Sequence, residues 1–306
     1  MSKTGITSDT HLADARFASV RSPARSVRRW FTVGKLRSKL FIFLLLIVGS
    51  SLLMLPFLWM LSTSLKPTEQ IFLFPPQWMP RPVQWSNYAD AWKTSPFGLY
   101  TWNTSIITGL NIVGNILGSS LAAFAFARLR FPGRHVLFLV MLSTMMVPIW
   151  VTIVPTFILF RLLGWTNSFL PLIVPGFFAV PFYTFLLRQY FMGISTELED
   201  AARMDGASTL RIYAQIVMPL AAPALATVAI FSFVHHWNDL LTPLIYLTDQ
   251  RKYTIALGLA GFRNAYRVEM SHLMAASTMA LLPVLVVYFF AQRLFIQGIM
   301  LSGSKG

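Results

Sequence analysis

The chain has 306 residues, of which 55% are hydrophobic and only 12% are charged. Soluble domains carry about 25% charged residues, so this composition argues against an ordinary soluble enzyme, and the absence of cysteine excludes disulfides, thiolate nucleophiles and cysteine-based metal sites. The net charge of +14 in so apolar a chain indicates membrane topology and lipid contact rather than nucleic-acid binding.

The first segment, residues 1–39, is expected to be a disordered, basic tail. It is rich in Ser, Arg and Ala and shows no apolar period. Seven basic residues lie between Arg21 and Lys39, which is typical of a topology signal on the cytoplasmic side. Contact with anionic lipid headgroups is the alternative role of these charges.

Six stretches without Asp, Glu, Lys or Arg follow, and they are 40–65, 94–127, 135–160, 162–187, 212–238 and 270–292. Each has at least 23 residues, whereas a helix that crosses a bilayer needs about 20. The stretches lack the polar face that a buried helix of a soluble protein would show. The expected fold class is therefore an all-α integral membrane protein, in which residues 40–306 form six transmembrane helices.

The distribution of basic residues predicts the orientation of these helices. With a cytoplasmic N-terminus, the inner segments hold 17 Lys and Arg and the outer segments hold 8. Cytoplasmic segments carry the excess of basic residues, so both termini are expected in the cytoplasm. The outer segment 66–93 is rich in Pro and Trp, and we expect a compact loop there rather than a helix.

Polar and helix-breaking residues interrupt several of the predicted spans. Asn111 and Asn115 are four residues apart, so they share one face of the second span. Prolines in the third and fourth spans remove backbone hydrogen bonds and favour kinks; they are Pro148, Pro155, Pro171, Pro175 and Pro181. Such helices are typical of bundles that move or line a cavity, although static bends in a packed bundle would leave the same pattern.

If the fifth span extends beyond its uncharged stretch to about Pro243, its polar end contains Asp239, the single carboxylate within a predicted span. His235 and Asp239 are four residues apart, which places them on one face of a continuous helix. Two interpretations remain open: the cluster lines a polar translocation path, or it forms a bond between helices near the outer surface. The candidate substrate-path residues are Asn111, Asn115, His235, Trp237, Asn238 and Asp239.

The segment 194–220, between the fourth and fifth spans, is the most polar of the loops and is predicted to lie in the cytoplasm. Thr196 followed by Glu199 forms a capping box, which predicts a short helix that ends near Met204. Gly206 is placed to end this helix in a left-handed conformation. The next helix, which runs into the fifth span, is predicted to be capped by Ser208.

The short predicted helix has two different sides. The apolar side is expected to hold Leu198, Ala201 and Ala202, and the polar side Glu199, Asp200 and Arg203. A helix that lies on lipid is the alternative, but four acidic residues in this stretch would face anionic headgroups unfavourably. Docking into a groove of another protein is therefore the favoured interpretation.

The stretch from Asp200 to Ala207 reads Asp-Ala-Ala-Arg-Met-Asp-Gly-Ala and resembles the EAA loop of permease subunits in bacterial ABC importers. The family pattern is approximately E-A-A-x-x-D-G-A followed by a proline, here Pro219 and Pro223; the first acid is Asp instead of Glu, which shortens its reach. The stretch Trp237-Asn238-Asp239 and the closing residues 292–306 are similar to MalG-like subunits of carbohydrate importers.

This resemblance implies a type I ABC importer permease fold over residues 40–306. In that family the helix of the EAA loop docks on an ATPase subunit, which assigns ATPase coupling here to Glu199, Asp200, Ala201, Ala202, Asp205, Gly206 and Ala207. The closing residues 293–306 are expected to reach toward the ATPase pair. The implied partners are a second, MalF-like permease subunit, two ATPase subunits, an extracytoplasmic solute-binding protein, a sugar substrate and the lipid of a bacterial inner membrane.

The expected function is that of a permease subunit of an ATP-driven importer for a di- or oligosaccharide or a glycerophosphate-type polyol. The sequence contains no G-x-x-x-x-G-K-[ST] phosphate loop, so ATP and Mg²⁺ are expected on the partner ATPase, and no cofactor, metal or catalytic residue is expected in this chain. An ion-coupled secondary transporter that uses His235 and Asp239 is the alternative, although such carriers bury several ionisable groups. An intramembrane enzyme is disfavoured because the five histidines show no H-E-x-x-H spacing.

Overall fold

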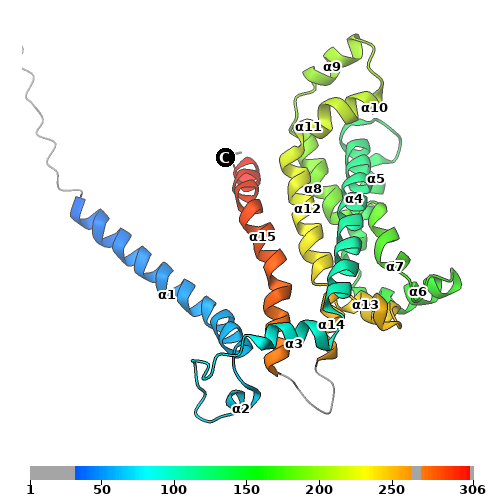
Figure 1. Ribbon diagram of the computed structural model, residues 1–306. Helices are drawn as coiled ribbons and strands as arrows, with labels where there is room; N and C mark the ends of the chain where they lie inside the picture. The colour runs from blue at the N-terminus through cyan, green and yellow to red at the C-terminus, as the bar shows by residue number, and fades with distance from the viewer. Residues whose placement is uncertain (1–31, 263–269, 304–306) are drawn as a thin grey trace, which may run out of the picture. The chain divides into compact units, whose positions relative to one another are not determined.

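The computed structural model describes residues 32–262 and 270–303, with side chains for 38–262 and 270–292, and all regular structure in these residues is helical. The chain divides into two units, Met1–Leu55 and Pro56–Gly306. The helices are α1 (Thr32–Ser64), α2 (Thr68–Ile71), α3 (Ser86–Thr94), α4 (Phe97–Arg128), α5 (Arg134–Ser143), α6 (Ile149–Leu162), α7 (Leu170–Ile173), α8 (Pro181–Met192), α9 (Glu197–Met204), α10 (Thr209–Ile212), α11 (Met218–Leu220), α12 (Ala222–Trp237), α13 (Leu241–Tyr246), α14 (Ile255–Gly261) and α15 (Met270–Gly303) (Figure 1). Short 3₁₀ turns occupy Thr144–Met146, Val174–Phe177 and Gln250–Lys252, and a π-helical turn occupies Tyr213–Val217. The predicted all-α fold is confirmed.

Helix α1 begins at Thr32, inside the segment predicted to be a disordered tail. Residues 32–39 are therefore helical, and residues 1–31 lie outside the described residues. The helix extends toward the N-terminus beyond the apolar stretch, because a backbone N–H or C=O group next to a bilayer costs free energy unless it is hydrogen-bonded, and a helix supplies that bond.

Four of the predicted spans are long apolar segments in the structure, namely Ser38–Ser64, Phe97–Arg128, Leu170–Met192 and Met270–Gln292. The other two are bent pairs: Arg134–Met146 meets Ile149–Leu162 at 101°, and Thr209–Leu220 meets Ala222–Trp237 at 78°. The described residues thus hold four helices of membrane-spanning length and composition, or six spans if each bent pair is one span. The bend in the third span is predicted from its prolines, whereas the bend in the fifth span is not predicted from the sequence.

Pro148 accounts for the sharpest bend. Proline has no N–H to donate and pushes the preceding residue into extended backbone, and here Val147 has ψ 116° and Pro148 has ψ 140°. The kink predicted from Pro148 is confirmed. Pro155, in contrast, lies inside α6 without ending it.

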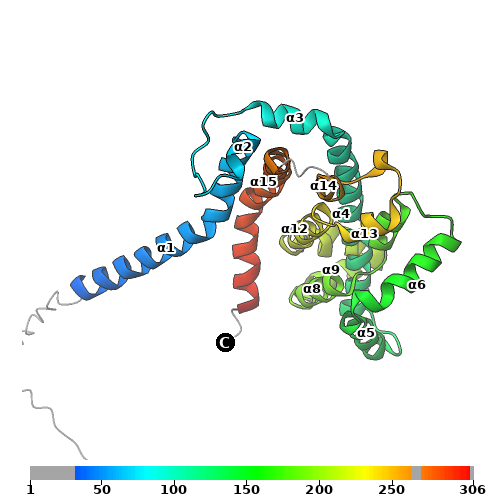
Figure 2. The same cartoon turned by 90° about the horizontal axis from the view of Figure 1, so that it is seen from below.

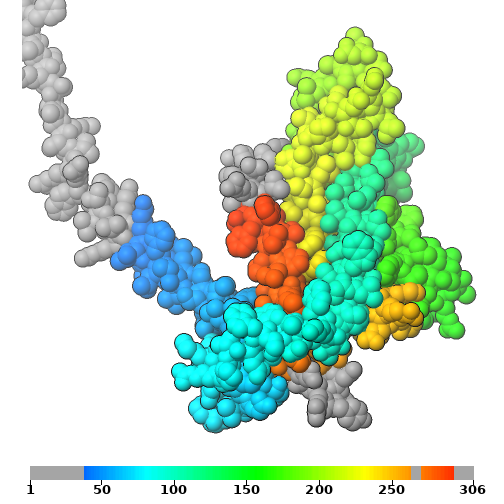
Figure 3. All heavy atoms as spheres, in the orientation of Figure 1, coloured from blue at the N-terminus to red at the C-terminus, as the bar shows by residue number. Residues whose placement is uncertain are grey.

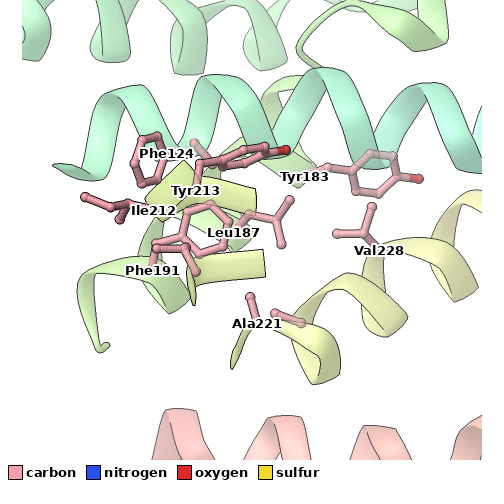
Figure 4. Close-up of a cluster of buried hydrophobic side chains, with 11 residues drawn as sticks. Phe124, Tyr183, Leu187, Phe191, Ile212, Tyr213, Ala221 and Val228 are labelled. Atoms are coloured by element: carbon pink, nitrogen blue, oxygen red, sulfur yellow. The ribbon is translucent and has the colours of Figure 1, made fainter. Parts of the chain in front are cut away.

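Helix α4 is the centre of the second unit, with α8 and α12 packed along it and α15 packed on α12 and α3 (Figures 1 and 2). A buried apolar cluster joins α4, α8, the segment before α12 and α12 itself; Figure 4 labels Phe124, Tyr183, Leu187, Phe191, Ile212, Tyr213, Ala221 and Val228 in it. Between helices in lipid, close van der Waals packing of this kind supplies much of the association energy.

A glycine allows the closest backbone approach in this packing. A Cβ at Gly118 of α4 would lie 2.9 Å from the carbonyl carbon of Phe177, so α4 and the 3₁₀ turn Val174–Phe177 meet backbone to backbone. Small residues permit such contacts between membrane helices.

The outer segment 66–93 contains helix, contrary to the prediction. The nine-residue helix α3 begins at Ser86, directly after the part that is rich in Pro and Trp. Its Asn87 side chain donates to the carbonyl oxygens of Ser64 and Lys66 at 2.9 Å, and Ala91 is fully buried. A stretch without proline can form a helix once tertiary contacts hold one of its faces.

Candidate functional site

Helix α9 lies at one end of the second unit, where it forms part of the exposed surface together with α10 (Figure 3). The predicted helix between Thr196 and Met204 is confirmed as Glu197–Met204. Gly206 ends it with φ +80°, and the amide of Ala207 donates to the carbonyl oxygen of Ala202 at 2.9 Å. These bonds satisfy groups that a helix end would otherwise leave without partners.

The predicted cap of the following helix is also present. The side-chain oxygen of Ser208 accepts a hydrogen bond from the amide of Arg211 at 3.3 Å. The turn between α9 and the next helix is therefore built as predicted, with Gly206 at its start and Ser208 at its end.

The predicted capping box is wrong. The side chain of Thr196 makes no capping hydrogen bond, and the hydroxyl of Ser195 accepts from the amide of Glu197 at 3.2 Å instead. Glu199 does not reach back to the helix start, because its carboxylate faces Arg128 at the end of α4.

Arg128 holds three elements together. Its Nε lies 2.8 Å from Oε1 of Glu199, and its Nη2 donates to the carbonyl oxygens of Phe191 and Ile194 at 2.6 Å each. The side chains of Arg128 and Glu199 are only 7% and 2% exposed. A buried charge pair needs such additional hydrogen bonds to offset its desolvation, and the fixed fork of a guanidinium supplies them.

The sides of α9 differ from the prediction. Glu199 faces inward, and Ala202 packs on the apolar cluster together with Ala207. The exposed side carries Leu198 at 49% and Met204 at 89% exposure, and Ala201, Asp205 and Gly206 are exposed as well. The assignment of Glu199 to the polar surface failed because a partner distant in sequence, Arg128, provides a buried counter-charge that helical periodicity does not register.

The exposed charges of α9 pair along its surface. Nη1 of Arg203 lies 2.8 Å from Oδ1 of Asp200, and Nη2 of Arg203 lies 3.3 Å from Oε2 of Glu199. Asp200, which stands where the EAA pattern has Glu, thus pairs with Arg203 one turn along. Exposed pairs of this kind contribute little to stability, about 0.3–0.5 kcal/mol.

Asn111 and Asn115 share one face of α4, as predicted, and both are 1% exposed. The amide nitrogen of Asn111 donates to the carbonyl oxygens of Ile107 and Leu172 at 2.9 and 2.8 Å. That of Asn115 donates to the hydroxyl of Ser232 at 2.8 Å and lies 3.4 Å from Nε2 of His236. This arrangement joins α4 to α7 and α12, and a role in the substrate path stays a prediction.

The polar cluster after the fifth span does not form one helical face. Helix α12 ends at Trp237, and Oδ1 of Asp239 accepts from the amide of Thr242 at 3.1 Å, in the helix that follows. The amide of Asn238 donates to the carbonyl oxygen of Val234 at 2.8 Å, and His235 is exposed. The bond between helices comes from the buried Trp237, whose Nε1 donates to the carbonyl oxygen of Ala280 in α15 at 3.1 Å.

Sequence reasoning missed Arg128 as a site residue. Its position at the end of an apolar span fits a topology signal equally well, and a single sequence does not reveal which acid a distant arginine meets. The closing residues 293–306, which were expected to contact the ATPase pair, lie outside the part whose side chains are described.

Three comparisons place the chain among known proteins. Residues 114–300 match the family model described as binding-protein-dependent transport system inner membrane component. The diacetylchitobiose uptake system permease protein NgcG of Streptomyces coelicolor is 35% identical over 252 residues, which cover 81% of this chain and 83% of the relative. The sn-glycerol-3-phosphate transport system permease protein UgpE of Yersinia enterocolitica is 32% identical over 270 residues, which cover 85% of this chain and 95% of the relative.

The fold has a solved counterpart. A chain of a bacterial ABC transporter involved in the import of the acidic polysaccharide alginate matches with a TM-score of 0.74 and 25% identity, over 86% of this chain and 98% of that chain.

Proposed function

The chain belongs to the family of binding-protein-dependent transport system inner membrane components, and on that premise we propose that it forms half of the translocation path of an ATP-driven importer that is coupled to its motor through α9. It is a permease of the ABC transporter class with an all-α transmembrane fold. One observation carries the proposal: α9 combines a buried charge that fixes it to the bundle with an exposed apolar side.

The exposed side of α9 has the chemistry of a docking surface. Leu198 and Met204 offer apolar area, and the small side chain of Ala201 allows a partner to approach the helix closely. Exposed apolar groups rimmed by charge, here Asp200 and Asp205, mark contacts between proteins. The partner we propose is an ATPase subunit that holds ATP and Mg²⁺, since the sequence has no phosphate loop of its own.

The complete importer in this proposal has a second, MalF-like permease subunit, two ATPase subunits and an extracytoplasmic solute-binding protein. Both termini and α9 face the cytoplasm of the bacterium. The excess of basic residues in the segments on that side supports this orientation.

The substrate class we propose is a di- or oligosaccharide or a glycerophosphate-type polyol. The support comes from the relatives, which are named for diacetylchitobiose and sn-glycerol-3-phosphate uptake. His235, Asn238 and Asp239 supply neutral and charged hydrogen-bonding groups at the opposite end of α12 from α11. The proposed substrate path consists of these three residues together with Asn111, Asn115 and Trp237.

The coupling role is tested by co-purification of the ATPase with the permease. Asp205→Arg changes the charge on the exposed side of α9, and Gly206→Pro removes the left-handed end of the helix. Both variants should lose the ATPase and uptake. Glu69→Arg, the same type of charge change on an exposed residue of α2, is the control and should retain both. Normal ATPase retention and uptake in the two α9 variants would refute the role.

The orientation is tested by labelling single cysteines in this cysteine-free chain. Met204→Cys and Phe74→Cys replace side chains that are 89% and 94% exposed. In intact cells an impermeant maleimide should label position 74 and spare position 204, and inside-out vesicles should reverse the pattern. Labelling of position 204 from outside the cell would overturn the orientation.

The substrate class is tested by uptake in a deletion strain complemented with this chain. The panel contains diacetylchitobiose, glycerol 3-phosphate and alginate oligosaccharides, and uptake of a sugar or polyol that follows cellular ATP supports the proposal. Uptake that collapses with an uncoupler while ATP stays normal would favour the ion-coupled alternative.

A further inference from the structure

We propose that Arg128 is a positioning residue that fixes α9 to α4, so that a displacement of α9 is carried along α4 to the segment 249–255 at the other end of the bundle. The inference rests on the proposed function, because it concerns what happens after a motor has moved α9. It assigns a role to a residue that none of the sequence motifs contains.

The first step is the connection between α9 and the bundle. Short turns flank α9, with Gly193 before it and Gly206 after it, and by themselves they would let the helix swing. Among the described residues, the ion pair of Arg128 with Glu199 is the one charge pair that joins α9 to another helix. Leaving the charge of Arg128 buried without Glu199 is strongly unfavourable, so α9 and the end of α4 move together.

The second step is the rigidity of the connection. The guanidinium of Arg128 binds Glu199 on one side and the carbonyl oxygens of Phe191 and Ile194 on the other. These carbonyls belong to the end of α8 and the turn before α9. Two hydrogen bonds from Nη2 hold the plane of the guanidinium, and the ion pair at Nε holds Glu199 beside it, which fixes the angle of α9 as well as its distance from α4.

The third step is the path along α4. This helix runs for 32 residues, about 48 Å at the α-helical rise. Near its start, the amide of Asn103 donates to the carbonyl oxygens of Arg251 and Tyr253 at 2.9 and 3.0 Å. The hydroxyl of Thr104 accepts from the amide of Ile255 at 2.9 Å. Asn103 and Thr104 are buried, so one continuous helix holds α9 at one end and the segment 249–255 at the other.

The test measures the accessibility of the segment 249–255 while the nucleotide state of the ATPase, at the α9 end of the permease, is changed. Arg251→Cys places the single cysteine of this chain on a side chain that is 86% exposed. The complex is purified with its own ATPase from host membranes, and maleimide labelling is timed without nucleotide and after trapping with Mg²⁺, ATP and vanadate. Trapping should change the labelling rate by about fivefold or more, the lower range for coupling between two sites.

Arg128→Gln should abolish this change while the ATPase still co-purifies, because the exposed side of α9 is untouched. Arg130→Gln removes the same charge from an exposed residue next to the site and should keep the change. A change that persists in Arg128→Gln with the ATPase retained would overturn the inference.

A cross-link separates positioning from simple loss of structure. Arg128→Cys and Glu199→Cys, joined by a bifunctional thiol reagent, replace the ion pair by a covalent link. In this variant position 251 carries an azide-bearing amino acid instead of cysteine, so that the cross-linker does not react there, and the link should restore the change in its labelling rate by a strained alkyne. If Arg128→Gln fails to assemble, this bridged variant decides the matter, and an assembled, bridged complex without a response would refute the inference. Failure of the proposed function appears separately, as ATPase retention in Asp205→Arg.

Discussion

The side-chain amide of Asn115 donates a hydrogen bond of 2.8 Å to the hydroxyl of Ser232, and so joins the middle of α4 to α12. Both residues are buried, at 1% and 0% exposure. Hydrogen bonds between membrane helices are modest in net strength, because the separated helices find other partners for their polar groups.

We therefore expect a double-mutant cycle of Asn115→Ala and Ser232→Ala to give a coupling energy of about 0.6 kcal/mol, and not above about 1.7 kcal/mol. Reversible unfolding in mixed micelles measures it. Asn238→Ala is the control, because its amide bonds the carbonyl oxygen of Val234 within its own segment, and it should show no coupling to Ser232. Additive effects in the first cycle would contradict the expected bond.

Gly118 and Gly109 predict opposite results for the same substitution in one helix. A Cβ at Gly118 would meet the backbone of Phe177, whereas nothing lies within 4 Å of one at Gly109. Gly118→Ala should destabilise the fold by about 1–3 kcal/mol through overpacking. Gly109→Ala should be neutral or should stabilise α4 by up to about 1 kcal/mol. Equal unfolding midpoints for the two variants would show that α4 and the Val174–Phe177 turn are not in close contact.

The left-handed conformation of Gly206, after α9, predicts that different substitutions at this position destabilise the turn to different degrees. Gly206 has φ +80° and open space around its Cβ position, so Gly206→Ala suffers backbone strain of about 1–2 kcal/mol without a steric clash. Asn tolerates this conformation better, so Gly206→Asn should cost less. The amide of Ala207 donates to the carbonyl oxygen of Ala202, so its hydrogen exchange reports the stability of this turn. The exchange should accelerate by about tenfold in Gly206→Ala. Unchanged exchange would contradict the role of this turn.

Lys66 predicts a dependence of stability on pH. Its side chain is 1% exposed, its Nζ lies 4.0 Å from the centroid of the Trp59 ring, and burial lowers the pKa of the amine below its usual 10.5. Above this lowered pKa the folded amine loses its proton, while the unfolded chain keeps it up to about pH 10.4. Stability relative to Lys66→Met should therefore rise with pH across that window.

Thermal unfolding midpoints of both proteins across the alkaline range measure this effect. Lys93→Met is the control, because the side chain of Lys93 is exposed in α3. Parallel curves for the wild type and Lys66→Met would show that the burial of the amine does not affect folding.

Local signals in the sequence predicted local structure well. The left-handed Gly206 and the cap at Ser208 depend on neighbouring residues only, and both are confirmed. The shared face of Asn111 and Asn115 follows from helical periodicity in the same way. The family resemblance was found from a stretch of eight residues, Asp200 to Ala207, for the same reason.

Long-range structure could not be predicted in this way. Glu199 fits a capping box as well as a buried ion pair, and only the fold brings Arg128 to it. Pro148 and Pro155 carry the same signal in the sequence, yet one breaks the chain by 101° and the other lies inside α6. The conformational preference of proline is the same at both positions, so it does not distinguish the two outcomes.

The two sides of α9 place different demands on sequence change. On the inner side, a substitution at Glu199 has to be matched at Arg128, since the charge of Arg128 would otherwise be buried without a counter-charge. On the outer side, substitutions need no matching change among the described residues, because Leu198, Ala201 and Met204 are exposed. These positions can therefore adapt to the surface of a partner. In the proposed importer, the surface that meets the ATPase can therefore diverge at a few exposed positions between related proteins, while the ion pair behind that surface is conserved.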